Sequence, residues 1–141
     1  MTVTKRNPFK LRDFRGVDPT FIAKLESSHI KNAEQMLVEG CTKERRLSLA
    51  EQTGIPEHAL LELVKLSDLA RLPGVKGIRA RLYYDAGVDS VEKMAGWEPE
   101  AFRMMVTEYV ERTGFDGIPP LPKEARSTVA NAQRLSKVLE D

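Results

Sequence analysis

The sequence contains one helix–turn–helix pattern twice, and its two copies are 58 residues apart. Phe14-Arg15-Gly16-Val17 returns as Leu72-Pro73-Gly74-Val75, and His29-Ile30 returns as Gly87-Val88. An internal repeat constrains the fold more than a single motif does, because each copy must form the same unit and neighbouring units bury a common core. Two copies of one small helical unit therefore fill most of this chain, whose 141 residues correspond to about one domain.

The residues that start and end secondary structure predict an all-α fold. Asp18-Pro19, Thr42 and Glu98-Pro99 are typical helix starts, and Gly54 is a typical left-handed helix end. We also expect a short helix over Pro8–Phe14 after the capping residue Asn7, and no segment shows strand-like alternation of useful length. The predicted domain has four parts: a first helix-hairpin-helix repeat (8–55), a second repeat (56–116), a Pro-rich connector (117–122) and a C-terminal helix (123–141).

Two of the expected helices organise the core. The segment Pro56–Leu72 is apolar on nearly all sides, which is typical of a buried helix that both repeats share. The C-terminal helix carries one apolar stripe and should therefore pack on the repeats. That stripe consists of Ala125, Val129, Ala132, Leu135 and Leu139.

Composition excludes several classes of function. With 41% hydrophobic and 30% charged residues and no apolar run of membrane-spanning length, the chain predicts a globular domain without a membrane partner. The lone Cys41 cannot form an internal disulfide, which favours a reducing, cytoplasmic setting. Because no Gly-rich nucleotide loop, metal-ligand cluster or catalytic triad is evident, we expect a non-enzymatic protein without a cofactor.

The second hairpin resembles the helix-hairpin-helix motif, with Gly74 and Val75 in the turn, then Ala80 and Tyr83, then Gly87-Val88. In that motif the turn lets backbone N–H groups and a helix N-terminus approach a nucleic-acid phosphate, as helix N-termini bind anions generally. Such contacts hold the backbone and carry little sequence information. The resemblance implies a candidate nucleic-acid-binding set of Gly74, Val75, Lys76, Gly77, Arg79 and Arg81.

Two departures from the motif leave a second hypothesis open. The motif has Gly-hydrophobic-Gly, whereas this chain has Gly74-Val75-Lys76 in one turn and Gly16-Val17-Asp18 in the other. Lys76 can supply a cation and Gly77 a permissive position, whereas Asp18 would repel a phosphate, so the first hairpin is predicted to be structural. The alternatives are therefore a module that binds nucleic-acid backbone without sequence specificity, and a scaffold whose helical surface binds another protein or a second copy.

At the scale of the whole chain, the sequence resembles an uncharacterised bacterial and archaeal domain-of-unknown-function family of double helix-hairpin-helix proteins. The resemblance rests on Arg46-x-x-Leu49-Ala50-x-x-Thr53-Gly54-Ile55, on the segment Ser67–Val75, and on Ala86-Gly87-Val88-Asp89-Ser90-Val91. It extends over roughly residues 8–140 and implies the fold, but the family has no settled activity to transfer.

Two further positions carry structural expectations. His29 replaces the glycine of the other copy, so we expect it at a helix end with a positive φ, where histidine is enriched among non-glycine residues. Of the adjacent Tyr83 and Tyr84, one should be in the core and the other beside Arg81.

Overall fold

The computed structural model describes residues 8–140, and within this range the chain is all-α. Extended pairing there is limited to an isolated bridge between Lys10 and Asn32. The predicted all-α class is therefore confirmed. The elements are the 3-10 helix η1 (Leu11–Asp13) and the α-helices α1 (Pro19–Ser27), α2 (Ala33–Gly40), α3 (Lys43–Thr53), α4 (Glu57–Leu69), α5 (Gly77–Asp85), α6 (Val91–Ala95), α7 (Pro99–Thr113) and α8 (Pro122–Arg134).

Most helix ends form where local chemistry predicts them. The side chains of Asp18, Thr42 and Ser90 each accept a hydrogen bond from a backbone N–H in the first turn of the following helix. Gly54 and Gly114 end α3 and α7 in the left-handed conformation, with φ of 75° and 71°. These signals act within a few residues and therefore depend little on the rest of the fold.

Positions that correspond in the two copies have backbones of the same handedness. Gly16 and Gly74 have φ of 76° and 80°, and His29 and Gly87 have φ of 67° and 105°. The positive φ expected for His29 is thus confirmed. Below, "first turn" denotes residues 14–18, which precede α1, and "second turn" denotes residues 73–76, which precede α5.

The N-terminal segment differs from the helix expected over Pro8–Phe14. The Leu11 N–H donates to the carbonyl oxygen of Lys31 at 3.0 Å, and the Ala33 N–H donates to the carbonyl oxygen of Phe9 at 2.8 Å. These bonds to the start of α2 hold the segment extended before η1, because an α-helix would use the same backbone groups internally. The expected cap, Asn7, lies outside the described residues.

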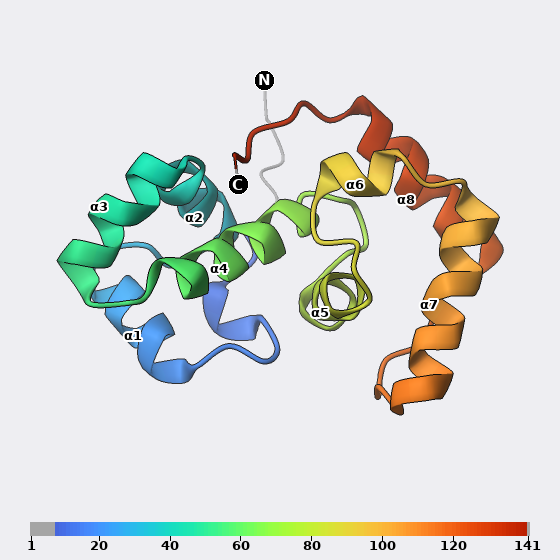
Figure 1. Ribbon diagram of the computed structural model, residues 1–141, viewed down its shortest axis with the longest axis horizontal. Helices are drawn as coiled ribbons and strands as arrows, with labels where there is room; N and C mark the ends of the chain where they lie inside the picture. Colours follow the sequence, from blue (N-terminus) through green and yellow to red (C-terminus); the bar gives the residue numbers. More distant parts are fainter. Residues whose placement is uncertain (1–7, 141) are drawn as a thin grey trace, which may run out of the picture.

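Helix α4 crosses the middle of the molecule, with α1, α2 and α3 on one side and α5 and α6 on the other (Figure 1). It packs against α2, α3 and α5. Its fully buried leucines include Leu60, Leu63, Leu66 and Leu69. The helix is shorter than the predicted Pro56–Leu72 because its end tightens into a turn in which the Leu72 N–H donates to the Leu69 carbonyl oxygen.

Helix α8 packs on α6 and α7 and buries Ala125, Val129 and Ala132, as its apolar stripe predicts. It ends at Arg134, however, and does not continue through Leu139. Residues 135–140, here called the C-terminal strap, run back across the molecule towards α2 and α3 (Figure 1). The expectation of one continuous helix to the C-terminus is therefore wrong for the strap.

Tertiary bonds explain why the strap is not helical. The Glu140 N–H donates to the Cys41 carbonyl oxygen at 2.8 Å, and the Arg71 guanidinium donates to the Ser136 carbonyl oxygen at 2.8 Å. Leu139 is buried, with 4% of its surface exposed. An extended strap can therefore bury Leu139 and satisfy backbone groups far from α8, which a continued helix could not reach.

Tyr83 is the core member of the tyrosine pair, and Tyr84 is half-buried with the Arg81 guanidinium carbon 5.3 Å from its ring centroid. The Tyr83 ring meets Phe102 edge-on at a centroid distance of 5.1 Å. Burial raises the pKa of the Tyr83 phenol from 10.0 to about 12, although nearby Arg79 acts to lower it. Among the described residues, the Tyr83 hydroxyl has no hydrogen-bond partner.

This burial predicts a loss of stability at alkaline pH. Because the folded-state pKa of Tyr83 lies above its unfolded value, its contribution is complete below pH 10 and is lost as pH rises through about 12. We expect the melting temperature of Tyr83→Phe to fall less steeply than that of the wild type between these pH values. Circular dichroism melts at a series of pH values measure both, and parallel declines would contradict the prediction.

Candidate functional site

The second turn is open to solvent on its outer side. Gly74 is exposed, and a Cβ built on it would meet no atom within 4 Å. Val75 is 1% exposed and anchors the turn in the core. Lys76 is exposed at the N-cap of α5, and its side chain makes no capping bond. Within residues 8–140 it also has no ion-pair partner. The N-terminus of α5 therefore carries a lysine in place of an acidic or hydroxyl cap.

The first turn has the opposite electrostatics. There Asp18 is the N-cap of α1, and its Oδ1 accepts a hydrogen bond from the Thr20 N–H at 2.8 Å. A carboxylate of the chain thus already occupies the N-terminus of α1, where an external anion would otherwise bind. This geometry agrees with a structural role for the first turn and sets it apart from the second.

Gly77 is buried, and close packing accounts for it. A Cβ at this position would lie 2.3 Å from the Asp13 carbonyl oxygen and 3.3 Å from the Phe9 ring. Its φ is not positive. The glycine therefore lets the end of η1 pack against the start of α5, and it is not the permissive turn position expected from the sequence.

The two arginines of the candidate set are engaged within the chain. Arg79 makes two hydrogen bonds to the Glu124 carboxylate, at 3.0 and 3.2 Å. The hydrogen bond from Arg79 lowers the pKa of Glu124. Arg81 is 8% exposed and donates to the carbonyl oxygen of Arg15 and to the carboxylate of Glu62, at 2.8 and 2.9 Å. Both side chains therefore hold distant segments on α5 and do not project beside Lys76 as free cations.

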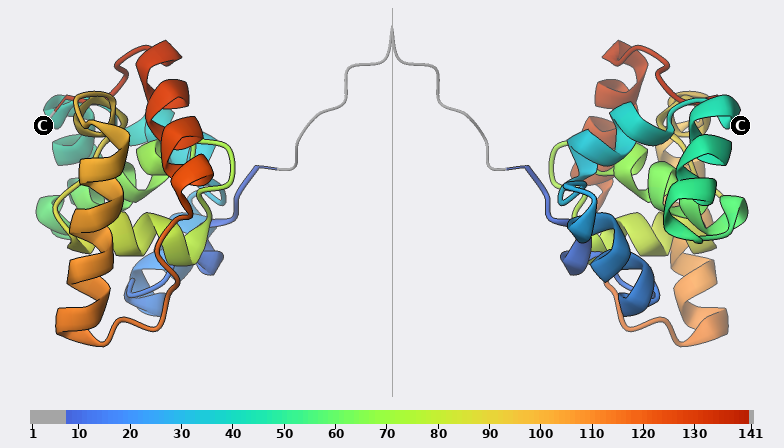
Figure 2. Two further views of the ribbon diagram at one scale, coloured as in Figure 1. Left: turned by 90° about the vertical axis from the view of Figure 1, so that its right-hand side faces the viewer. Right: turned by 90° about the vertical axis from the view of Figure 1, so that its left-hand side faces the viewer.

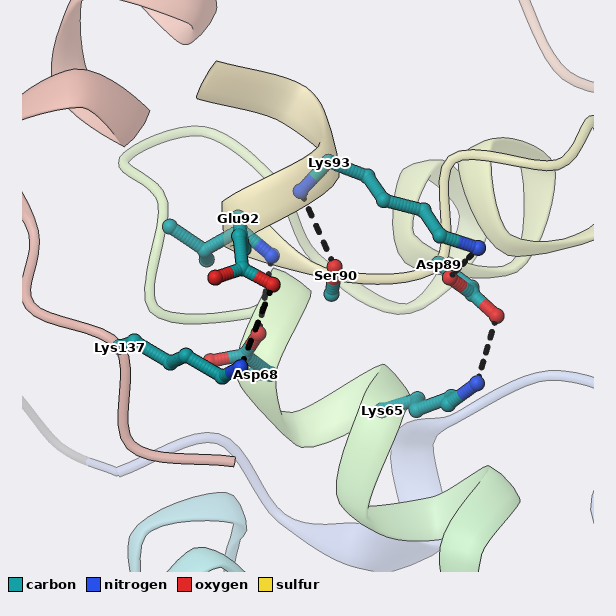
Figure 3. Close-up of polar contacts among 8 residues, drawn as sticks. Lys65, Asp68, Asp89, Ser90, Glu92, Lys93 and Lys137 are labelled. Carbon is teal, nitrogen blue, oxygen red and sulfur yellow. Dashed lines mark hydrogen bonds and ion pairs between the residues drawn. The ribbon is translucent and has the colours of Figure 1, made fainter. Parts of the chain in front are cut away.

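Hydrogen bonds and ion pairs connect the start of α6 with α4 and with the C-terminal strap (Figure 3). The carboxylate of Asp68, 3% exposed on α4, accepts the Val91 N–H at 2.8 Å and forms an ion pair with Arg71 at 2.8 Å. Lys137 of the strap pairs with Glu92 at 3.4 Å. The N-terminus of α6 thus has an internal anion. Sequence reasoning missed Asp68, because α4 also carries Glu57, Glu62 and Lys65 and nothing local distinguishes the buried acid from these.

Asp89 makes a second set of charge contacts where α4 meets the start of α6. Its carboxylate lies 2.8 Å from Lys65 Nζ and 2.9 Å from Lys93 Nζ (Figure 3). Burial acts to raise the pKa of Asp89, but the hydrogen bonds from the two lysines outweigh burial and the pKa is lowered. These charges stabilise the junction of α4 and α6. Of the six candidate residues, only Gly74 and Lys76 of the second turn are exposed to solvent.

Among the described residues, no group of three or more His, Cys, Asp and Glu side chains could hold a metal ion. Helices in residues 8–140 are also too short or too polar to cross a bilayer.

A family model for a domain of unknown function, DUF4332, matches residues 15–135. The chain belongs to this family. The DUF4332 match begins within the first turn, at Arg15, and includes the second turn, helix α4 and all of α8. The chain shows no match to a curated protein or to a solved structure.

Proposed function

We propose that the chain is a non-catalytic helix-hairpin-helix module that binds nucleic-acid backbone phosphates without sequence specificity. The observation that carries the proposal is the N-terminus of α5, where exposed Lys76 stands at the N-cap and no side chain caps the helix. A helix N-terminus attracts anions through its unpaired N–H groups and its dipole. The corresponding place in the first turn is already filled by Asp18.

The proposed contact surface is smaller than the six-residue set. It consists of the exposed Gly74 and Lys76 with the backbone between and just after them. Arg79 and Arg81 contribute by keeping α5 in place, through Glu124 and Glu62. Because phosphates look alike in every sequence, such a surface positions a strand without selecting bases.

The reducing, cytoplasmic setting suggested by the lone Cys41 is part of the same proposal.

Lys76→Glu tests the phosphate contact. A charge-assisted hydrogen bond contributes about 1.5–3 kcal/mol, so the variant should bind at least roughly tenfold more weakly at low salt. The slope of log affinity against log salt on duplex DNA should also become shallower by about 0.9, as one phosphate contact is lost. Fluorescence anisotropy of a labelled duplex measures both quantities.

Lys24→Glu is the control, because it makes the same charge reversal on exposed α1 while the turn stays intact. It should change affinity much less than Lys76→Glu. Equal effects of the two substitutions, or no binding of any nucleic acid by the wild type at low salt, would refute the phosphate contact.

A second candidate function is protein binding through α7. This helix packs beside α8 at the edge of the molecule (Figure 2). Met104 on its outer face is 60% exposed and shares a shallow groove with Met105, Glu108 and Glu111. Methionines adapt to varied apolar partners, and the acidic flank suits a basic amphipathic helix. Under this hypothesis Met104→Glu abolishes binding of a basic helical peptide, whereas Lys76→Glu leaves it unchanged.

A further inference from the structure

A cavity of about 210 Å³ lies beside the second turn, and Lys76 belongs to both. The cavity is formed where the N-terminal segment and α2 meet the end of α4. Its walls are the half-buried side chains of Phe9, Leu37 and Ala70, and Lys76 and Glu34 stand exposed at its rim. An apolar recess with an aromatic wall thus opens directly next to the proposed phosphate contact.

The cavity also contains a polar group without a partner. Ser67 on α4 is fully buried and lines the cavity, and among the described residues its hydroxyl makes no hydrogen bond. A buried hydroxyl without a partner is unfavourable by about 1–3 kcal/mol and calls for an explanation. A ligand that donates to or accepts from this hydroxyl would supply one.

The wall on the side of α4 is held in place. Arg71 lines the cavity, but its guanidinium donates to Asp68 and to the Ser136 carbonyl oxygen, both at 2.8 Å. Arg71 therefore adds positive charge without being free to swing into the space. Its two partners connect the cavity wall to α6 and to the C-terminal strap.

Size and chemistry together narrow the occupant. The volume of about 210 Å³ is below the roughly 300–1,000 Å³ of pockets that hold drug-sized ligands, so a single ring system fits better than a larger molecule. A flat heterocycle would stack on Phe9, and polar atoms on its edge would meet the Ser67 hydroxyl. Exposed Lys76 then favours an anionic group just outside the rim.

We propose that this cavity receives one nucleobase of a single-stranded nucleic acid, whose neighbouring phosphate lies at Lys76 and the N-terminus of α5. The inference rests on the proposed function and deepens it by naming the strand form. In a duplex each base is stacked and paired, so it cannot enter without being flipped out, whereas a single strand presents unpaired bases that stack on aromatic side chains. The chain therefore binds single strands more tightly than duplexes.

The test compares a labelled single strand with a duplex of equal length by fluorescence anisotropy at low salt. One stacked base corresponds to an affinity gain of about fivefold or more, which sets the expected preference of the wild type for the single strand. Ala70→Leu places a larger side chain in the cavity and should reduce single-strand affinity to the duplex level while duplex affinity is retained. Ala23→Leu, the same substitution at an exposed position of α1, should leave both affinities unchanged.

Ser67→Ala provides a second variant, which should fold even if Ala70→Leu does not, because it only removes a hydroxyl that lacks a partner. It should weaken single-strand binding by about fivefold, the value of one hydrogen bond of roughly 1 kcal/mol, and leave duplex binding unchanged.

The outcomes separate the two proposals. If the wild type binds neither the single strand nor the duplex at low salt, the phosphate contact itself is refuted. The base pocket alone is overturned if Lys76→Glu weakens duplex binding but the wild type shows no preference for the single strand. A single-strand preference that persists in both Ala70→Leu and Ser67→Ala has the same consequence. A free nucleoside monophosphate that binds as tightly as the oligonucleotide also overturns the base pocket, because the occupant would then not be part of a strand.

Discussion

Arg46→Ala is expected to lower the free energy of unfolding by about 3 kcal/mol or more, which is the range for truncating a large, fully buried side chain to alanine. Arg46 is fully buried on α3. Its Nε donates to Glu57 at the start of α4, and its Nη1 donates to the Gly40 carbonyl oxygen at the end of α2, both at 2.8 Å. Without the guanidinium, three helices lose their common hydrogen-bond donor and a cavity remains where its stem packed.

Urea denaturation followed by circular dichroism measures this loss, with Arg45→Ala as the control. Arg45 is the next residue of the same helix, is exposed, and bonds the Val38 carbonyl oxygen at 2.8 Å. Its replacement should cost less than about 1 kcal/mol, as is usual for surface side chains. Similar losses for the two variants would contradict the role given to burial.

Gly77→Ala should also destabilise the fold, by about 2–3 kcal/mol, the upper part of the range for overpacked sites. The new Cβ would lie 2.3 Å from the Asp13 carbonyl oxygen. Because this oxygen belongs to the backbone, it cannot rotate away as the end of a side chain can, and the segment before the first turn would have to separate from α5.

Gly96→Ala is the matched control for that clash. Gly96 follows α6 with a φ of −86°, and the nearest atom to an added Cβ is the Lys93 carbonyl oxygen at 3.6 Å, an ordinary contact. We expect its free energy of unfolding to change by less than about 1 kcal/mol. If Gly77→Ala is as stable as Gly96→Ala, the two segments are not packed as closely as described.

The sequence predicts helix ends well because their chemistry is local. The capping bonds of Asp18 and Thr42 and the left-handed Gly54 involve neighbours at most four residues away. Such signals survive whatever the tertiary arrangement is. The positive φ of His29 could be predicted from the repeat instead, because a glycine stands at the matching place of the other copy.

The candidate site could not be predicted as well, because distant residues decide which of its cations are free. Arg79 pairs with Glu124, 45 residues away, and Arg81 bonds the backbone of Arg15, 66 residues away. A basic cluster in one segment of sequence gives no information about these partners. The strap was missed for a similar reason. Leu139 continues the apolar spacing of α8, but that spacing cannot show that Leu139 leaves the helix and is buried elsewhere in the fold.

The position of α4 has a consequence for how the protein responds to a ligand. Its buried leucines serve the cores on both sides, so neither side keeps a complete core when the other opens, and we expect the chain to unfold in one cooperative step. An oligonucleotide at a hundred times its Kd would add about 2.7 kcal/mol to that single step. Amide protons of α3, remote from the second turn, would then exchange more slowly whenever a strand is bound, so that a helix without any contact to the nucleic acid reports its binding.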